Sequence, residues 1–426
     1  MDIEKISIVG LGYVGLPSAV EFAKAGLTVF GIEQNPAKVE KVNRGESYIE
    51  DVDSKELFKA VSSGKLKAFI EFYPVKDSDA VIICVPTPLT AHKEPDISYI
   101  VNVTSEIAKF LKEGQLVVLE STTYPGTTEE VVLPILEKSG LKAGKDFYLA
   151  FSPERVDPGN REFTMRDIPK VVGGINKEST ELAGKLYSYI TNKVYPVSSP
   201  KVAEMEKLLE NIFRLVNISF VNELALLCQR MNIDIWEVIS AASTKPYGFM
   251  PFYPGPGLGG HCIPIDPFYL SWKAKEYDFD VRFIELAGEI NDSMPYYIVD
   301  MVMKALNTQK KALNGSKVLV IGVAYKPNVA DPRESPALKI IPELEKLGAK
   351  VEYYDPFIKE IKIKDKLYTS IELKEEEVKS SDCILIVTDH NNIDYHLLYD
   401  NAQLIVDTRN ALRKRGIKID ERVTRL

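Results

Sequence analysis

Short apolar runs alternate with longer amphipathic stretches in the first part of this 426-residue chain. An apolar run at residues 6–9 precedes a helical spacing of apolar positions over residues 13–25, and a β-rich run follows at residues 28–32. Short apolar runs predict buried strands, whereas apolar positions three and four apart predict an amphipathic helix. The pattern therefore predicts a strand–helix–strand unit, the building block of a parallel sheet.

Further apolar runs alternate with helical segments as the chain continues. They lie at residues 80–85, 116–119, 147–151 and 170–172. Nearly continuous apolar strands separated by helices are typical of a parallel sheet covered on both faces. We therefore predict an N-terminal domain of this kind over residues 1–198.

The hydrophobic pattern changes after this point. A long helical pattern with few breakers runs from Lys201 to Ser240 and predicts a central helical domain over residues 199–305. Strand and helix patterns alternate again from Lys317, which predicts a second sheet domain over residues 306–426. The predicted fold class is α/β, with two Rossmann-like parallel-sheet domains joined by a central helical domain.

Composition and charge narrow the classes of function. The chain has 53 basic and 61 acidic residues, a net charge of −8, which argues against general affinity for nucleic acid. The N-terminus is charged where a signal peptide is apolar, and the longest apolar run, residues 215–227, is interrupted by polar side chains. We therefore expect a cytoplasmic protein without a membrane span.

The four cysteines are far apart and show no metal-ligand spacing. They are Cys84, Cys228, Cys262 and Cys383. Neither a disulfide framework nor a zinc site is indicated, and we expect no metal. At least one of these thiols is therefore available for chemistry.

The motif GLGYVG follows the first predicted strand. Gly10 permits a tight turn, Gly12 lets a pyrophosphate approach the backbone, and Gly15 lets helix and strand pack closely. Tyr13 and Val14 lie in the same turn, and Glu33 follows the second predicted strand, where a carboxylate binds ribose hydroxyls. A carboxylate there repels a 2′-phosphate, so NAD is favoured over NADP. The alternative is a turn without a ligand and a solvated Glu33.

The corresponding turn of the second sheet domain is GVAYKPNVADPRES, in which Gly322 is the only glycine. It brings two cations, Lys326 and Arg333, and we do not expect it to bind a second dinucleotide. Lysine and arginine are good phosphate partners, so this domain is expected to hold a different phosphate ligand. The alternative is that both cations are solvated or form structural ion pairs.

Several motifs occur together and in a characteristic order. They are GLGYVGLP, CVPTP, ESTTYPGTT, SPERVDPG, EKLLEN, GPGLGGHCIPIDP and YKPNVADPRESP. In this order they resemble the UDP-glucose/GDP-mannose dehydrogenase family, the nucleotide-sugar 6-dehydrogenases, over nearly the whole chain. The cysteine segment is most similar to UDP-N-acetylglucosamine 6-dehydrogenases, then to UDP-N-acetylmannosamine dehydrogenases, and less to the UDP-glucose enzymes.

The resemblance implies that Cys262 is a catalytic nucleophile and that Asp266 works beside it with an ordered water. An aldehyde has no hydride to give until a nucleophile adds to it, and thiolate addition makes it tetrahedral. A second oxidation then gives a thioester, which water cleaves to the carboxylate. The alternative for Cys262 is a small buried apolar side chain.

The resemblance also implies further catalytic residues. Thr123 matches a catalytic threonine, although Thr122 is one position away. Lys207 and Asn211, four apart on a helix and so on one face, match a pair that stabilises alkoxide and oxyanion charge. Glu154 matches a glutamate near the thioester or its attacking water, the alternative being a loop salt bridge.

Ligand contacts follow from the resemblance with alternatives still open. Further cofactor contacts are implied at Pro86, Thr87, Thr122 and Arg333. Substrate contacts are implied at Arg155, Tyr253, Gly259, Lys326 and Arg409. The loop around Tyr253 is equally interpreted as ordinary turn and packing residues. His261 is not expected to be catalytic, because adjacent side chains of an extended segment point opposite ways.

The chain departs from the UDP-glucose branch at two places. Ile265 stands where that branch has a lysine, and Lys245 is the nearest candidate for an arginine that crosses the dimer. The resemblance implies a homodimer that pairs through the long helix, and a UDP-sugar substrate. UDP-N-acetylglucosamine is favoured, with UDP-N-acetylmannosamine and UDP-glucose as alternatives. A two-electron dehydrogenase and a non-catalytic nucleotide-sugar sensor are competing interpretations.

Overall fold

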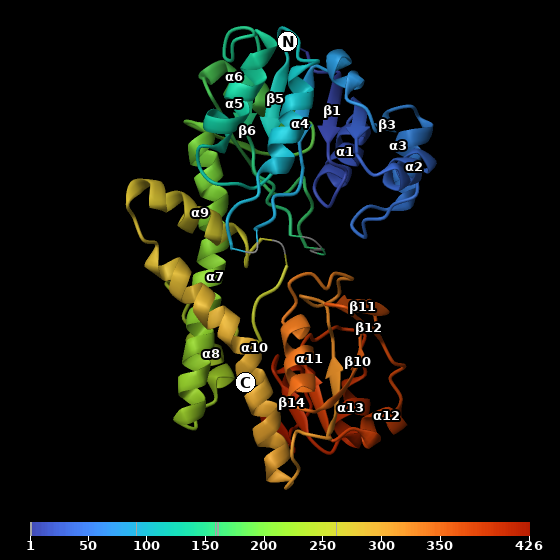
Figure 1. The fold of residues 1–426 in the computed structure, drawn as a ribbon, viewed down its shortest axis with the longest axis vertical. Helices are drawn as coiled ribbons and strands as arrows, with labels where there is room; N and C mark the ends of the chain where they lie inside the picture. The colour runs from blue at the N-terminus through green and yellow to red at the C-terminus, as the bar shows by residue number, and fades with distance from the viewer. Residues whose placement is uncertain (1, 91, 158, 160–161, 261) are drawn as a thin grey trace. The chain divides into compact units, whose positions relative to one another are not determined.

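The computed structural model describes residues 2–90, 92–157, 159, 162–260 and 262–426. The inference about His261 therefore lies outside the described residues. The chain forms two compact units. Unit 1 comprises Met1–Glu210 and Phe268–Asp280, and unit 2 comprises Asn211–Pro267 and Val281–Leu426. Each unit is built around one large sheet (Figure 1).

The sheet of unit 1 has eight strands in the order β3-β2-β1-β4-β5-β6-β7-β8. Their bounds are β1 Lys5–Val9, β2 Thr28–Ile32, β3 Leu66–Phe69, β4 Ala80–Ile83, β5 Leu116–Leu119, β6 Tyr148–Phe151, β7 Lys170–Gly174 and β8 Val194–Val197. Strands β1 to β6 pair in parallel throughout. The strand order reverses at β1, which lies between β2 and β4 and so forms the switch point where such sheets bind ligands.

The last two strands correct the expectation of a wholly parallel sheet. Strand β7 pairs antiparallel with β6, and β8 is parallel to β7. A parallel return needs a crossover, usually a helix, and the described residues between β6 and β7 contain none. The chain therefore turns back beside β6.

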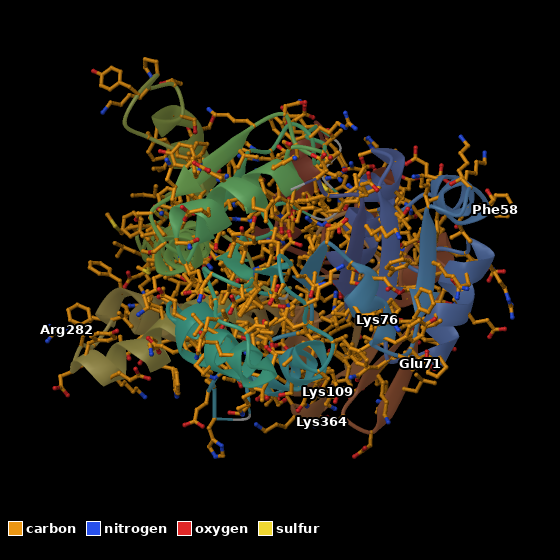
Figure 2. All side chains as sticks on the ribbon, turned by 90° about the horizontal axis from the view of Figure 1, so that it is seen from above. Phe58, Glu71, Lys76, Lys109, Arg282 and Lys364 are labelled. Atoms are coloured by element: carbon orange, nitrogen blue, oxygen red, sulfur yellow. The ribbon has the colours of Figure 1, made fainter. Side chains whose placement is uncertain are left out.

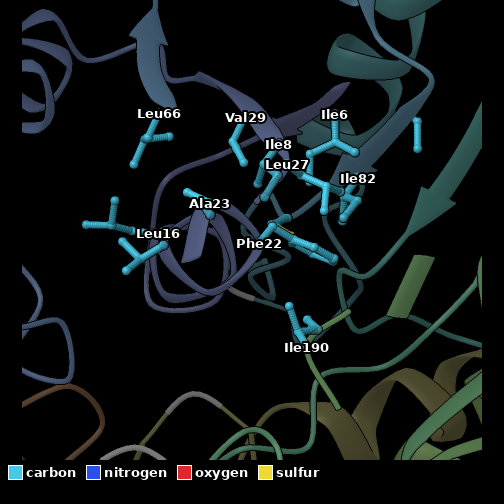
Figure 3. Close-up of a cluster of buried hydrophobic side chains, with 14 of the residues drawn as sticks. Ile6, Ile8, Leu16, Phe22, Ala23, Leu27, Val29, Leu66, Ile82 and Ile190 are labelled. Carbon is cyan, nitrogen blue, oxygen red and sulfur yellow. The ribbon is translucent and has the colours of Figure 1, made fainter. Parts of the chain in front are cut away.

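Two buried clusters cover the faces of this sheet. Residues Ala80 and Ile82 of β4 belong to a cluster with α1, whereas Val81 and Ile83 belong to a second cluster with α4. This alternation follows the two-residue period of a strand. The first cluster is shown in Figure 3, and the exposed Phe58 of α3 is labelled in Figure 2. The helices are α1 Gly15–Lys24, α2 Pro36–Arg44, α3 Ser54–Ser62, α4 Ser98–Ala108, α5 Leu133–Leu136 and α6 Lys177–Tyr187.

Unit 2 contains a five-stranded sheet with the order β10-β9-β13-β14-β15, and every strand pair is parallel. The bounds are β9 Lys317–Ile321, β10 Lys350–Tyr354, β13 Cys383–Ile386, β14 Ile405–Asp407 and β15 Val423–Arg425. Its helices are α11 Ala337–Lys346, α12 Glu375–Ser380, α13 Tyr395–Asn401 and α14 Ala411–Lys414. The prediction of two Rossmann-like sheets is confirmed. Sequence analysis missed the hairpin of β11 (Glu360–Ile363) and β12 (Lys366–Thr369).

The long helical pattern of residues 201–240 forms two helices rather than one. Helix α7 spans Pro200–Arg230, and α8 spans Ile235–Ala242. The chain leaves the helical conformation at Asn232, whose φ is 58°, and Asp234 then caps α8 by accepting from Trp236 N. Asparagine tolerates the left-handed region and aspartate is a preferred N-cap, so local chemistry explains the break.

Two more helices complete the chain, α9 Asp266–Ala274 and α10 Arg282–Thr308. Within unit 2, Ser219 of α7 donates a hydrogen bond of 2.8 Å to the carbonyl of Ala287 in α10. Helix α7 is also long and apolar enough, by length and composition alone, to cross a membrane, with 28% of its most apolar window buried. A core helix meets the same criterion, so the absence of a membrane span stays a prediction.

The cap of α8 gives a test of this fold. Asp234 accepts from Trp236 N at 3.0 Å and also binds Arg413 and Arg425. Asp234→Ala should lower stability by about 1–2 kcal/mol, because the cap and both ion pairs are lost. Asp234→Asn keeps an oxygen for the cap and should cost less. Thermal unfolding of the two variants measures this, and equal losses would contradict the role of the cap.

Candidate active site

The glycine-rich turn of unit 1 has the shape that a pyrophosphate site needs. Gly10 has a φ of 92°, and a Cβ at Gly15 would overlap the Gly10 carbonyl. A Cβ at Gly12 would meet nothing within 4 Å. Gly10 and Gly15 thus shape the turn and its contact with α1, whereas Gly12 leaves open space where a ligand can approach the backbone.

Glu33, just after β2, is tied to this turn. Its Oε2 accepts from Leu11 N at 3.2 Å and its Oε1 accepts from Asn35 N at 3.0 Å, while Tyr48 donates to the Leu11 carbonyl at 2.6 Å. A carboxylate has about four acceptor sites, so it can still accept from ribose hydroxyls. The open glycine turn, the N-terminus of α1 and Glu33 together fit a dinucleotide.

The other predicted residues of unit 1 follow neighbouring parallel strands. Pro86 and Thr87 come after β4, Thr122 and Thr123 after β5, and Glu154 and Arg155 after β6. Strands β1, β4, β5 and β6 are adjacent, so their carboxyl ends open at one edge of the sheet (Figure 1). The structure therefore brings these predicted residues to one edge, together with the glycine-rich turn.

The proton of the Thr123 hydroxyl has a defined direction. Thr127 Oγ1 donates to the Tyr124 carbonyl at 2.8 Å, which uses its only proton. The 2.8 Å contact between the hydroxyls of Thr123 and Thr127 then has Thr123 as its donor. The Thr123 oxygen keeps its lone pairs for another donor. Thr123 is buried and Thr122 is half-buried, so both candidates for the catalytic threonine lie at this edge of the sheet.

Lys207 lies one turn after an anchor between α7 and the loop after β5. Glu204, fully buried, accepts from Gly126 N at 2.6 Å and from Thr128 N at 2.9 Å. Lys207 itself is 8% exposed, and nothing among the described residues pairs with its ammonium by a hydrogen bond or an ion pair. Glu206 and Glu210 of the same helix attract this charge without a direct ion pair, so the ammonium can still pair with a ligand charge.

Arg155, a predicted substrate contact, is already bound by carboxylates of α7. Its guanidinium donates to Glu210, lies 3.4 Å from Glu206 and donates to the Pro169 carbonyl at 2.8 Å. Burial, together with a hydrogen bond to and repulsion from Glu210, raises the pKa of Glu206 to about 7. A contact between Arg155 and substrate would require these ion pairs to be exchanged.

In unit 2, three predicted catalytic residues are linked. Asn211 Nδ2 donates to Asp266 Oδ2 at 2.7 Å, and both side chains are buried. The Cys262 carbonyl accepts from Asp266 N at 2.8 Å and from Ile265 N at 3.1 Å. Cys262 is exposed and lies four residues before the first residue of α9.

The glycines before Cys262 pack against the loop after β9. A Cβ at Gly259 would clash with the Glu334 carbonyl and with Tyr325, and Gly260, with a φ of 87°, donates to the Arg333 carbonyl at 3.0 Å. Gly259, predicted as a substrate contact, thus serves a close contact within the protein. Its glycine identity has a structural cause without invoking a ligand.

The two cations of that loop lie in different surroundings. Arg333, a predicted cofactor contact, donates to both oxygens of Asp331 at 2.8 and 2.6 Å. This contact agrees with the alternative interpretation, in which Arg333 forms a structural ion pair. Lys326 is half-buried, with its Nζ 5.9 Å from the centre of the Tyr325 ring.

The turn after β9 is closed from within the protein. Asp355, directly after β10, accepts through its Oδ2 from Val323 N at 2.7 Å and from Ala324 N at 3.1 Å. It also contacts His390 Nε2 at 3.1 Å. These are the backbone donors that a pyrophosphate would use at an open glycine-rich turn.

The last two predicted substrate contacts are Arg409 and Tyr253. Arg409 donates to the Val387 carbonyl at 2.9 Å, and a Cβ at Gly255 would lie 2.5 Å from its Nη1. Tyr253 stacks on Trp236, with ring centres 6.0 Å apart and an interplanar angle of 14°. Arg409 therefore packs against the segment that leads to Cys262. Tyr253 packs on Trp236 but remains 52% exposed.

Sequence reasoning missed the charged residues that support this edge of unit 1. Glu120 and Lys170 are buried and bonded to each other, and Glu204 anchors α7. The available signal was a charge directly at the end of a fully apolar strand, as in LVVLE and PKVVGG. Charged residues are almost never fully buried unless they are paired.

Comparison with known proteins agrees with this arrangement. The chain matches the NAD binding domain of the UDP-glucose/GDP-mannose dehydrogenase family at residues 4–191, its central domain at 201–293 and its UDP binding domain at 319–414. A UDP-N-acetyl-D-glucosamine 6-dehydrogenase from Pseudomonas aeruginosa is 40% identical over 356 residues, 83% of each chain. A UDP-N-acetyl-D-mannosamine dehydrogenase from Methanococcus vannielii is 36% identical, covering 98% of this chain and 96% of its own.

A solved structure is also similar over nearly the whole chain. The UDP-D-ManNAc dehydrogenase from Pyrococcus horikoshii has a TM-score of 0.88 at 34% identity, covering 98% of this chain and 96% of its own. An NAD-binding sheet and a UDP-binding sheet in one chain define a nucleotide-sugar dehydrogenase. The chain belongs to the UDP-glucose/GDP-mannose dehydrogenase family, and its cofactor is NAD. The predicted family, enzyme class and cofactor are confirmed.

Two glycines of the turn provide a matched test of the NAD site. Gly12→Ala should leave thermal stability nearly unchanged, because its Cβ meets no protein atom, yet weaken NAD binding about tenfold or more. Gly15→Ala should destabilise the fold by about 1–3 kcal/mol, because its Cβ overlaps the Gly10 carbonyl. Thermal unfolding and NAD titration separate the two effects. Wild-type NAD affinity in the Gly12 variant would contradict this account of the turn.

Proposed function

We propose that this enzyme oxidises the C6 hydroxymethyl group of UDP-N-acetylglucosamine to the uronate, removing four electrons at one carbon. The observation that carries this is the linked set in unit 2: an exposed Cys262 whose backbone bonds to Asp266, which in turn binds Asn211. A simple alcohol dehydrogenase has no use for a thiol held in this way. Bound NAD, held by the turn at Gly10–Gly15 and by Glu33, supplies the hydride acceptor.

The role of Cys262 follows from the chemistry of the aldehyde. The thiolate adds to the aldehyde carbon, forming a C–S bond and a thiohemiacetal. Loss of the second hydride leaves a thioester, and water then forms a C–O bond as the C–S bond breaks and the thiolate leaves. In total, the alcohol, one water and two NAD give the carboxylate, two NADH and three protons.

The neighbouring residues suit the charges that develop. Asn211 uses one N–H for Asp266, so its second N–H is available to a developing oxyanion. Lys207, a buried side chain of the same helix, supplies a positive charge. Donors of this kind contribute about 3 kcal/mol each when preorganised. Asp266 is the candidate base, working with an ordered water, and Glu154 is the candidate to hold the water that attacks the thioester.

The sugar is proposed from the cysteine segment and from the relatives. The segment GPGLGGHCIPIDP favours UDP-N-acetylglucosamine. The UDP-N-acetyl-D-glucosamine 6-dehydrogenase from Pseudomonas aeruginosa, 40% identical, supports the same sugar. The name of the Methanococcus vannielii relative favours UDP-N-acetylmannosamine as the alternative. We also propose a cytoplasmic location and a role in supplying uronates for polysaccharide synthesis.

Stoichiometry tests the four-electron reaction. With UDP-N-acetylglucosamine the wild-type enzyme should form two NADH per sugar and release a uronate. Cys262→Ser should stop turnover after substrate oxidation, because no thioester can form. A panel of UDP-sugars in the same assay identifies the substrate. One NADH per sugar with a free aldehyde or ketone, or full activity of Cys262→Ser, would sink the proposal.

We further propose that the protein is a homodimer paired through α7. Phe213, Phe220 and Leu227 are seven residues apart, which places them on one face of the helix, and each is about half exposed. An apolar stripe of this kind is typical of an interface.

A charge in this stripe tests the dimer. Phe220→Glu should convert the dimer to a monomer, because a carboxylate cannot be buried without a partner. Arg214→Glu, an exposed change on a different face of the same helix, serves as the matched control. Light scattering after gel filtration measures the mass. A dimer that survives Phe220→Glu at micromolar concentration would exclude pairing through this face.

A further inference from the structure

Three charged side chains lie together behind the site edge of unit 1. Glu120 directly follows β5, Glu154 follows β6, and Lys170 is the first residue of β7. Their side chains are 1%, 13% and 7% exposed. The antiparallel register of β6 and β7 explains how Lys170 meets Glu154. Phe151 lies opposite Gly173, so continuing this register places residue 154 opposite residue 170.

The ammonium of Lys170 is shared by two carboxylates. Its Nζ donates to Glu120 Oε1 and, at 2.9 Å, to Glu154 Oε2. It also lies 5.0 Å from the centre of the Tyr187 ring. On the far side, Glu120 Oε2 accepts from the Cys84 thiol at 3.2 Å. One positive charge therefore serves two buried negative charges.

The hydrogen bonds of Glu154 leave one acceptor position open. Its Oε1 accepts from Arg155 N and Val156 N, both at 2.6 Å, and its Oε2 accepts from Lys170. A carboxylate has about four acceptor positions, so one remains on Oε2. That position suits a water molecule, and Glu154 can take the proton of that water only as a carboxylate.

We propose that Lys170 is a positioning residue that keeps Glu154 ionised and ready to accept from water, while Glu120 competes for the same ammonium and so limits that effect. The proposal rests on the proposed function in one respect, which is that Glu154 acts in thioester hydrolysis. The arrangement of charges stands on the contacts within unit 1.

The balance of burial and charge supports this assignment. Burial opposes ionisation of Glu154, but attraction to Lys170 and the two backbone N–H groups outweighs it and holds the pKa of Glu154 below its usual value. For Glu120, burial prevails and raises the pKa, even though Lys170 and the Cys84 thiol favour the charged form. The pKa values of the two carboxyl groups are thereby driven apart, with Glu154 as the more acidic of the pair.

The other titratable groups around the cluster supply no second cation in ion-pair contact with Glu154. Burial, with the nearby Glu120 carboxylate, raises the pKa of the Cys84 thiol and of the Tyr187 phenol well above their usual values. Both are therefore neutral at physiological pH. Arg155 contributes attraction from the side of α7, where Glu206 and Glu210 already bind it. Lys170 is thus the cation in direct contact with Glu154.

The first measurement follows Glu154 by NMR without any turnover. In protein labelled with ¹³C at the glutamate carboxyl groups, Glu154→Gln assigns the signal of Glu154. Lys170→Met should raise the pH at which that signal titrates by at least about one pH unit, a tenfold change in proton affinity. Lys170→Arg should keep the wild-type titration. An unchanged titration in folded Lys170→Met would overturn the proposal.

A second variant protects the test against unfolding. Lys170→Met leaves two buried carboxyl groups without a cation, so Lys170→Met with Glu120→Gln restores the net charge of the cluster. Glu154 should still titrate at higher pH than in wild type, because the ammonium is missing. As a matched control, Lys273 is a buried lysine of unit 1 between Glu130 and Glu276. Lys273→Met should lower stability and leave the Glu154 titration unchanged.

The second measurement connects Lys170 with the reaction. In single-turnover experiments, the acid limb of the pH profile for uronate release should move upward in Lys170→Met with the NMR titration. A shifted NMR titration with an unshifted profile would overturn the assignment of Lys170 to hydrolysis. If wild type releases no uronate, the proposed function fails, and the NMR result still decides the charge arrangement by itself.

Discussion

The hydrogen bond of 2.7 Å between Asn211 and Asp266 is the constraint on which the chemistry of unit 2 depends. It joins two buried side chains that are 55 residues apart in sequence. Asp266 also binds the Cys262 carbonyl through its backbone N–H, so the same residue fixes the start of α9 and the cysteine segment. Removing one partner of a buried charged hydrogen bond leaves the other unsatisfied, which typically costs several kcal/mol. The backbone of Cys262 is therefore held by a residue whose side chain also takes part in the proposed reaction.

The two sheets show how one architecture serves two ligands. In unit 1, Glu33 accepts from a single backbone N–H of the glycine-rich turn, and the position of Gly12 stays open. In unit 2, Asp355 accepts from two successive N–H groups, Val323 and Ala324, and so closes the turn. The first turn fits a dinucleotide, and the second is filled by the protein. The family match assigns NAD binding to the first region and UDP binding to the second, in agreement with these differences.

The sequence predicts best what depends on local pattern. The strands of both sheets and the glycine-rich turn follow from apolar runs and short spacings. The reversal of β7 and the break at Asn232 depend on the connections, which periodicity does not describe. The ion pairs of Arg155, and the sharing of Lys170 by two carboxylates, join residues from separate strands and helices. No local signal specifies such partners, although a charge at the end of an apolar strand marks where to look.

The most direct test of the central claim is the mass of the Cys262 peptide during turnover. Glu154→Gln should slow hydrolysis, so acid quenching after mixing with UDP-N-acetylglucosamine and NAD should capture a thioester. The account predicts that the peptide containing Cys262 gains the mass of the oxidised UDP-sugar and loses it on treatment with hydroxylamine. An unmodified Cys262 peptide while NADH and uronate are being formed would contradict covalent catalysis at this thiol.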